Sequence, residues 1–261
     1  MGKRCFLLAA AVLILTASGA FAQWNTVYQT DFEAPTYTVG QTINGQDGWA
    51  LTSSTLNEQI TVQKEPDPST NQFMYIGLSS VGTGSTVGAY HQIPTTGTGS
   101  HVRLSYDWMM LTTDVNSNNE AYGLWAMLTG TTDPAANRAG MIGGNYDTTS
   151  GTGTFKAFGG GGAGWTAFGS FSLNTAYELM MDVDMTNKIY DVYLNGEKKL
   201  SGLGFYTATL ESVSYVHFYR RYKAGTYAID NVSVETVPEP SSILALACGL
   251  AGLAGYIRRK V

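Results

Sequence analysis

Acidic side chains on one predicted strand are the first candidates for chemistry. Glu178, Asp182 and Asp184 alternate with apolar residues and therefore share one face of that strand. Two carboxylates about 5 Å apart can cleave a glycosidic bond, one as general acid and the other as nucleophile. Asp184, however, directly precedes a short polar segment, where an aspartate ordinarily supports a turn. We therefore predict no catalytic residue, and keep Glu178, Asp182 and Glu120 as candidate acids of the alternative, a glycoside hydrolase or lyase.

Other chemical motifs have little support in the sequence. The histidines, His91, His101 and His217, are isolated, with no second His or Cys at zinc-ligand spacing. The run Gly159-x-Gly161-x-x-Gly164 matches a dinucleotide-binding pattern, but no predicted helix follows to present amide groups to a pyrophosphate. We interpret this run as a glycine-rich loop.

Aromatic residues beside polar loops are the candidate binding groups. A sugar presents flat apolar ring faces edged by hydroxyls, so its site needs exposed aromatics flanked by amides or carboxylates. Trp125, Tyr122, Tyr146 and Trp165 lie next to Gly- and Asn-rich segments, and Asn145 could supply hydrogen bonds, as could Asn118 and Asn119. The competing interpretation is that these aromatics belong to the core, where we place Trp49 and Trp108.

The elements that must position these groups are strands. Alternation of apolar and polar residues predicts strands at 24–32, 102–109, 177–185, 189–194, 215–222 and 227–234. Glycine-rich and polar composition predicts loops at 79–88, 130–153 and 159–164. Val102, Leu104, Tyr106 and Trp108 should share one buried face. Asn195-Gly196 predicts a two-residue hairpin turn, because both residues tolerate positive φ. The sequence thus indicates an all-β chain, an antiparallel sandwich or barrel.

The charge distribution argues against a nucleic-acid partner. The 261 residues include 15 Lys and Arg and 20 Asp and Glu. Five of the basic residues lie at the two ends, which leaves ten basic against nineteen acidic residues between Gln23 and Val237, a net charge of −9. Ten scattered cations do not form the basic patch that neutralises phosphates.

Both ends carry apolar runs that have the form of targeting segments. Residues 1–22 have a basic start, an apolar stretch and the small-residue site Ala20-Phe21-Ala22, which predicts a signal peptide cut after Ala22. Residues 237–261 hold Pro238-Glu239-Pro240, a 15-residue apolar run and a basic end. That run is shorter than the ~20 residues of a typical membrane span, but two prolines separate it from the domain and the terminal arginines fit the positive-inside rule. We expect a folded domain at 23–236.

The C-terminal segment resembles the PEP-CTERM sorting signal, through Pro238, Glu239, Pro240, Arg258 and Arg259. The resemblance implies a Gram-negative protein exported across the inner membrane and held there transiently by a C-terminal transmembrane helix. An exosortase would cleave near the motif, leaving the protein at the cell surface or in an extracellular matrix. The two cysteines, Cys5 and Cys248, lie in segments expected to be removed, so we expect no disulfide in the mature domain.

The segment 177–196, with the opening Asp31-Phe32-Glu33 and the closing 229–234, resembles concanavalin-like and laminin-G-like jelly rolls. Related carbohydrate modules hold a structural Ca²⁺ between a Glu of the first strand and an Asp of the last, and the resemblance assigns these positions to Glu33 and Asp230. Two carboxylates with loop carbonyls could supply the oxygen ligands of calcium. The alternative is that both are ordinary polar residues at strand ends.

Together these patterns favour an exported surface or matrix protein with a non-catalytic jelly-roll domain and an extracellular polysaccharide as the expected ligand. The first alternative is a glycoside hydrolase or lyase that acts on such a polysaccharide. The second is a purely structural or adhesive matrix protein. Carboxylates that converge in a cleft would favour the enzyme, and a surface without exposed aromatics would favour the adhesive protein.

Overall fold

The chain folds as two antiparallel β-sheets packed face to face, which confirms the predicted all-β sandwich. The computed structural model describes residues 24–52, 60–65, 69–77, 86–98, 100–112, 123–133, 137–147, 150–160, 164–221 and 225–238. The predicted signal peptide lies outside these residues, as does the tail beyond Pro238. Within the described residues, no helix has the length and apolar character needed to cross a membrane.

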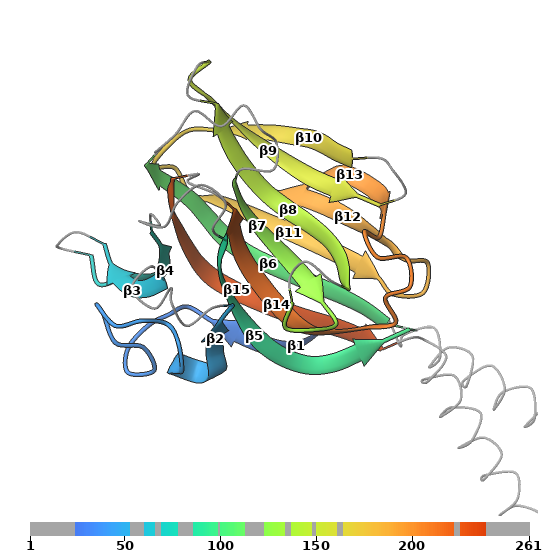
Figure 1. Ribbon diagram of the computed structural model, residues 1–261, viewed down its shortest axis with the longest axis horizontal. Coiled ribbons are helices and arrows are strands. Elements are labelled where there is room, and N and C mark those ends of the chain that lie inside the picture. Colours follow the sequence, from blue (N-terminus) through green and yellow to red (C-terminus); the bar gives the residue numbers. More distant parts are fainter. Residues whose placement is uncertain are drawn as a thin grey trace, which may run out of the picture.

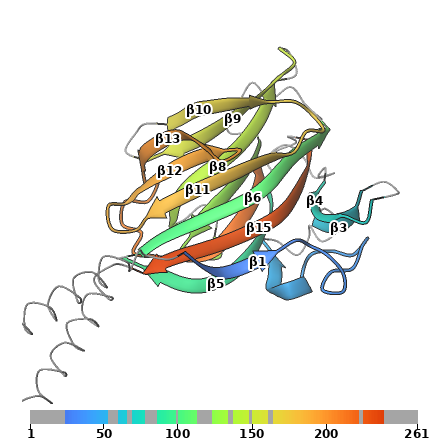
Figure 2. The same cartoon turned by 180° about the vertical axis from the view of Figure 1, so that it is seen from behind.

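Sheet A has eight strands (Figure 2). Their order is β13 (Glu197–Gly204), β12 (Ile189–Leu194), β11 (Tyr177–Asp184), β6 (Ser100–Thr112), β15 (Thr226–Pro238), β4 (Gln72–Ile76) and β3 (Ile60–Lys64), and β1 (Asn25–Thr30) also pairs with β15. The long strands β6 and β15 therefore form the middle of the sheet. All of its pairings are antiparallel.

Sheet B has seven strands and forms the other layer (Figure 1). Their order is β10 (Gly164–Phe171), β9 (Thr152–Gly159), β8 (Arg138–Asp147), β7 (Gly123–Thr129), β14 (Ser212–Arg221), β5 (Thr86–Gly97) and β2 (Trp49–Leu51). A short 3₁₀ turn, η1 (Gln46–Gly48), precedes β2.

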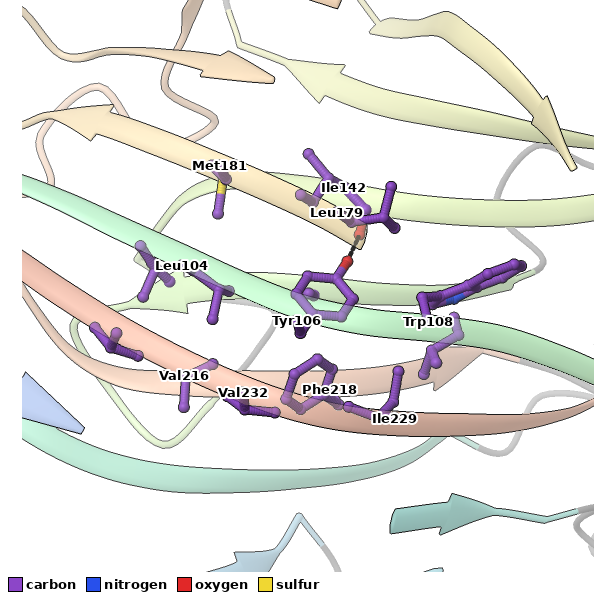
Figure 3. Close-up of a cluster of buried hydrophobic side chains, with 14 of the residues drawn as sticks. Leu104, Tyr106, Trp108, Ile142, Leu179, Met181, Val216, Phe218, Ile229 and Val232 are labelled. Atoms are coloured by element: carbon purple, nitrogen blue, oxygen red, sulfur yellow. Dashed lines mark hydrogen bonds between the residues drawn. The ribbon is translucent and has the colours of Figure 1, made fainter. Parts of the chain in front are cut away.

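The core lies between the sheets and follows the predicted alternation. Val102, Leu104, Tyr106 and Trp108 of β6 are all buried, with at most 1% of each side chain exposed. They pack against side chains of both sheets (Figure 3). The hydroxyl of Tyr106 donates a hydrogen bond to the carbonyl oxygen of Ile142 on β8 at 3.3 Å, which links the two sheets through the core (Figure 3).

The hairpins around β12 confirm the predicted turn chemistry. Asn195 (φ 50°) and Gly196 (φ 76°) connect β12 to β13 in the left-handed region, as the Asn-Gly pair predicts. Asp184 supports the turn between β11 and β12, since its carboxylate accepts hydrogen bonds from the main-chain N–H groups of Thr186 and Asn187, both at 2.9 Å. Partial burial opposes ionisation of Asp184, but these bonds outweigh it and lower its pKa. Asp184 is therefore a turn residue.

The predicted loop at 130–153 is wrong, because β8 and the start of β9 lie inside it. The predicted loop at 79–88 likewise contains the first residues of β5. The glycines of β8 serve close packing rather than turning. A Cβ on Gly140 would lie 2.5 Å from the Tyr190 ring, and one on Gly143 would overlap the main-chain oxygen of Leu124. Glycine is needed at these positions because another element approaches the strand backbone.

Candidate functional site

Strand β7 is buried on both faces, which identifies an apolar cluster outside the main core. Leu124, Ala126 and Leu128 belong to the core between the sheets. The alternate residues Trp125 and Met127 form a second cluster with Met141 of β8. Because strand side chains alternate, this second cluster lies on the outer face of sheet B, the face turned away from sheet A.

Trp125 of this cluster begins a chain of four aromatic rings, which we call the aromatic row: Trp125, Trp165 and Phe158 of sheet B, and Tyr206 of the segment after β13. The Trp125 and Trp165 ring centroids lie 4.1 Å apart at 37°. Phe158 contacts Trp165 edge-on at 4.9 Å and Tyr206 at 5.2 Å. Trp125 is only 2% exposed and supports Trp165 from beneath, whereas Tyr206 is 42% exposed. A flat apolar ligand face could therefore reach Trp165 and Tyr206.

Polar and basic groups border the aromatic row. The Arg138 guanidinium lies 3.7 Å from the centroid of the Tyr206 ring. Asn145 and Lys156 occupy outward positions of β8 and β9, in register with Thr154 and Gly143. Among the described residues, Asn145 Oδ1 and Trp125 Nε1 are buried and have no hydrogen-bond partner. Buried polar atoms of this kind ordinarily have a hydrogen-bond partner, and neither atom is open to a surface ligand in this conformation.

Of the five predicted binding residues, Trp125 and Trp165 are in contact, and Asn145 lies on the same face of sheet B, two residues along β8 from Gly143, the register partner of Trp125. Tyr146 points to the other side of β8, because it follows Asn145 directly in the strand. Its ring packs 6.2 Å from Phe171, and its hydroxyl donates to the Gly151 carbonyl at 2.9 Å. Tyr122, Asn118 and Asn119 lie outside the described residues.

Sequence reasoning missed Phe158, Tyr206 and Arg138. Phe158 immediately precedes Gly159, where glycine content predicted only a loop. Tyr206 follows β13 and approaches β8 through a hydrogen bond from its N–H to the Ala139 carbonyl at 2.7 Å. No local pattern carries such a long-range contact. Alternation along β9 was the one available signal, since it places Phe158 on the outward face with Lys156.

A buried histidine lies near the aromatic row on the same face of sheet B. His217 of β14 is in register with Met127 of β7 and Tyr90 of β5. Its ring stacks on Tyr90, with centroids 5.4 Å apart, and its Nε2 lies 3.1 Å from the Thr131 carbonyl. Burial lowers the pKa of His217 to about 4, so the ring is neutral near pH 7. The side chain is 0% exposed and therefore unable to contact a ligand in this conformation.

Glu178 and Asp182, two candidate acids of the enzyme alternative, lie on the side of the sandwich opposite the outer face of sheet B. Leu179, Met181 and Val183 of β11 face the core, so Glu178 and Asp182 point outward from sheet A. Asp182 is held by Arg103, whose Nη2 lies 3.0 Å from Oδ2. Glu120 lies outside the described residues.

A cleft of about 190 Å³ on sheet A contains one of the two predicted calcium ligands, Asp230. Asp230 lies opposite Asp107 in the β15–β6 register, and both carboxylates line the cleft. Burial raises the pKa of Asp230 to about 6, and the neighbouring carboxylates of Asp107 and Glu33 add to the increase. The charges of Glu33 and Asp230 therefore interact. Asp107 is a further carboxylate beside Asp230, and only the strand register could reveal it.

Amide donors surround these carboxylates. Asn71 Nδ2 donates to Asp230 at 3.2 Å, Asn231 Nδ2 donates to Asp107 at 2.8 Å, and the Gln72 N–H donates to Glu33 at 2.7 Å. Carboxylate and amide oxygens are ligands that suit Ca²⁺. However, the part of the chain that the structure describes contains no group of three His, Cys, Asp or Glu side chains arranged to hold a metal ion. The calcium site stays a prediction.

Comparison with known families identifies the C-terminal segment. The PEP-CTERM protein-sorting motif matches residues 236–260, which include Pro238, Glu239, Pro240, Arg258 and Arg259. The chain is therefore an exosortase substrate, exported and processed for the cell surface. A search of curated protein sequences found no match.

Solved structures share the fold at low sequence identity. One is a carbohydrate esterase, vb_24B_21, from the Shiga toxin-encoding bacteriophage phi24B, with a TM-score of 0.55, 11% identity, and coverage of 83% of this chain and 100% of the other. Another is a variant of alginate lyase Aly36B in complex with an alginate trisaccharide, with a TM-score of 0.51, 15% identity, and coverage of 82% and 98%. A sialidase matches with a TM-score of 0.51 and 13% identity over 77% of this chain, but the match spans only 18% of the sialidase. These likenesses confirm the concanavalin-like sandwich.

Proposed function

We propose that the protein is a non-catalytic surface protein that binds an extracellular polysaccharide along the aromatic row. The observation that carries the proposal is the contact chain from Trp125 through Trp165 and Phe158 to Tyr206, bordered by Arg138. Its exposed rings provide the flat apolar surface that a sugar ring stacks on, and the flanking polar groups can bond to hydroxyls. These exposed aromatics also count against a purely adhesive role.

Two of the candidate acids lie away from the proposed binding surface, whereas the carboxylates that converge in a cleft, Asp107 and Asp230 on sheet A, keep the hydrolase or lyase as the alternative. Glu178 and Asp182 point outward from sheet A, whereas Trp125, Trp165 and Phe158 of the row lie on the outer face of sheet B. A polysaccharide bound to the row therefore lies on the other side of the sandwich from both carboxylates. His217 is neutral and near the row, but its complete burial separates it from such a ligand. A general base must come within hydrogen-bond reach of the proton that it removes.

We further infer a Gram-negative location in which the tail holds the protein transiently in the inner membrane. Exosortase processing then leaves the sandwich at the surface or in the extracellular matrix. The support is the order of motif, apolar run and terminal Arg258-Arg259 within the matched segment.

The test is a binding screen of residues 23–238 against a panel of polysaccharides. The panel includes alginate, because a structural neighbour was solved with an alginate trisaccharide, and neutral glucans. We expect Trp165→Ala to weaken binding of the retained polysaccharide about tenfold, the loss of about 1.4 kcal/mol of stacking. Tyr193→Ala is the matched control. Tyr193 lies on sheet A, away from the row, and its ring centroid is 5.3 Å from Lys198 Nζ.

Equal loss in both variants, or none in Trp165→Ala, would reject the aromatic row as the binding surface. Each retained polysaccharide is then incubated with the protein and assayed for new reducing ends and for the ultraviolet absorbance of unsaturated products. Either product would replace the proposal with the hydrolase or the lyase. No retention of any polysaccharide would favour the adhesive alternative.

A further inference from the structure

The strands of the two sheets carry opposite net charge. In the part of the chain that the structure describes, the strands of sheet A contain eight acidic and four basic residues. The strands of sheet B contain one acidic residue, Asp147, and four basic residues, Arg138, Lys156, Arg220 and Arg221. Trp125, Trp165 and Phe158 of the aromatic row therefore lie on the positively charged layer of an acidic protein.

Lys156 of β9 lies beside the tryptophans of the row. Its side chain points outward, because its neighbours Phe155 and Ala157 belong to the core. Lys156 is in register with Gly143 of β8, which is in turn in register with Trp125 of β7. Because Gly143 has no side chain, β8 places none between Lys156 and Trp125 at this level of the sheet.

Arg138 lies at the other end of the row, against Tyr206. Its guanidinium is 3.7 Å from the centroid of the Tyr206 ring, and that ring lies 5.2 Å from the ring of Phe158. Tyr206 is 42% exposed, so the guanidinium borders an accessible ring. A guanidinium stacked on a ring directs its N–H donors sideways, in the planar geometry that pairs with anionic oxygens.

Most acidic groups of the sandwich are too far from this face to cancel its charge. Asp107 and Asp182 point outward from sheet A, the sheets of a sandwich pack about 10 Å apart, and charges are screened over about 8 Å at physiological salt. Asp147 lies four positions along β8 from Gly143, a distance of about 13 Å. Asp133, in the segment after β7, acts on the buried His217.

We propose that the ligand of the aromatic row is an acidic polysaccharide, one whose repeating sugars carry carboxylate or sulfate groups. This inference rests on the proposed function, because it names the class of polysaccharide that the row binds. The exposed rings stack on the faces of the sugars, and Lys156 and Arg138 pair with the acidic groups along the edge of the sugar chain. A neutral polysaccharide gains only the stacking.

The test compares polymers that share a backbone and differ in charge. Polygalacturonate is paired with its methyl ester, and dextran sulfate is paired with dextran, so the two pairs separate carboxylate from sulfate. Each polymer is immobilised, and binding of the full-length protein in detergent is measured by biolayer interferometry. We expect at least one acidic polymer to bind about tenfold more tightly than its neutral partner at 0.05 M NaCl. At 1 M NaCl, where charges are screened over about 3 Å, most of this difference should disappear.

Three lysine variants locate the attraction on the molecule. Lys156→Gln should weaken binding of the acidic polymer about fivefold and leave binding of its neutral partner unchanged, whereas Lys156→Arg should retain the wild-type affinity. Lys198→Gln is the matched control, because Lys198 lies on sheet A, with 48% of its side chain exposed. Trp165→Ala should instead weaken both polymers of a pair equally, because it removes stacking rather than charge.

The outcomes separate this inference from the proposed function. Equal affinity within both pairs, combined with a loss of binding in Trp165→Ala, would overturn the acidic ligand and leave the aromatic row as the binding surface. An equal loss in Lys156→Gln and Lys198→Gln would also overturn it, because the attraction would then not lie at the row. Binding of none of the polymers would reject both proposals. If a lysine variant fails to fold, the wild-type comparison within each pair still decides the class of ligand.

Discussion

Replacing Asp230 by asparagine should stabilise the protein, and only above the pKa of the carboxyl. Burial and the carboxylates of Asp107 and Glu33 raise the pKa of Asp230 from 3.8 to about 6. The folded state therefore binds this proton more tightly than the unfolded state. Asp230 contributes its full stabilisation below about pH 4, and that stabilisation is lost as the pH rises through 6.

The shift of about two units corresponds to about 3 kcal/mol, at 1.36 kcal/mol per unit. Asp230 is only partly buried, so solvent screening reduces this to about 1–2 kcal/mol. Asparagine has nearly the same shape and never ionises. We expect Asp230→Asn to raise the free energy of unfolding by about 1–2 kcal/mol at pH 8 and to leave it nearly unchanged at pH 3.5.

The assay is urea unfolding of both proteins at pH 3.5, 5 and 8, with EDTA present to remove metal ions. Asp191→Asn is the matched control. Burial of Asp191 is outweighed by hydrogen bonds from Lys198, Gly202 and Ser201, which lower its pKa, so this variant should lose stability at pH 8. A loss of stability at pH 8 in Asp230→Asn, or a gain of equal size at all three pH values, would refute the reasoning.

Three further outcomes follow from the same contacts. Calcium added after EDTA treatment should raise the thermal unfolding midpoint of the wild type at pH 8 but not that of Asp230→Asn, because a cation relieves the repulsion between the carboxylates. An unchanged midpoint of the wild type would reject the calcium site. Gly143→Ala should lower the free energy of unfolding by urea by about 3 kcal/mol or more, because the new Cβ overlaps a main-chain oxygen of β7. Gly151→Ala is the comparison: the space there is open, but Gly151 has a φ of 69°, so alanine should cost only about 1–2 kcal/mol. Tyr106→Phe should cost about 1 kcal/mol by removing the bond to the Ile142 carbonyl, and equal midpoints would show that this bond contributes nothing.

The period of two along a strand predicted which residues share a face but not which strands are neighbours. It placed Val102, Leu104, Tyr106 and Trp108 in the core, and these are buried. Trp125 and Trp165 meet because β7, β8, β9 and β10 are consecutive in sheet B, a pairing that no local pattern specifies. Composition failed in β8, where glycine marks close approach of other elements rather than a turn.

The sorting segment and the proposed binding surface belong to different sheets of the sandwich. The ends of β1 and β15 belong to sheet A, and three of the four rings of the aromatic row, Trp125, Trp165 and Phe158, lie on the outer face of sheet B. The core, with Tyr106 linking the sheets, lies between these two regions (Figure 3). Because the matched sorting segment continues from the end of β15, it leaves the sandwich from sheet A, and the proposed binding surface lies away from it on sheet B.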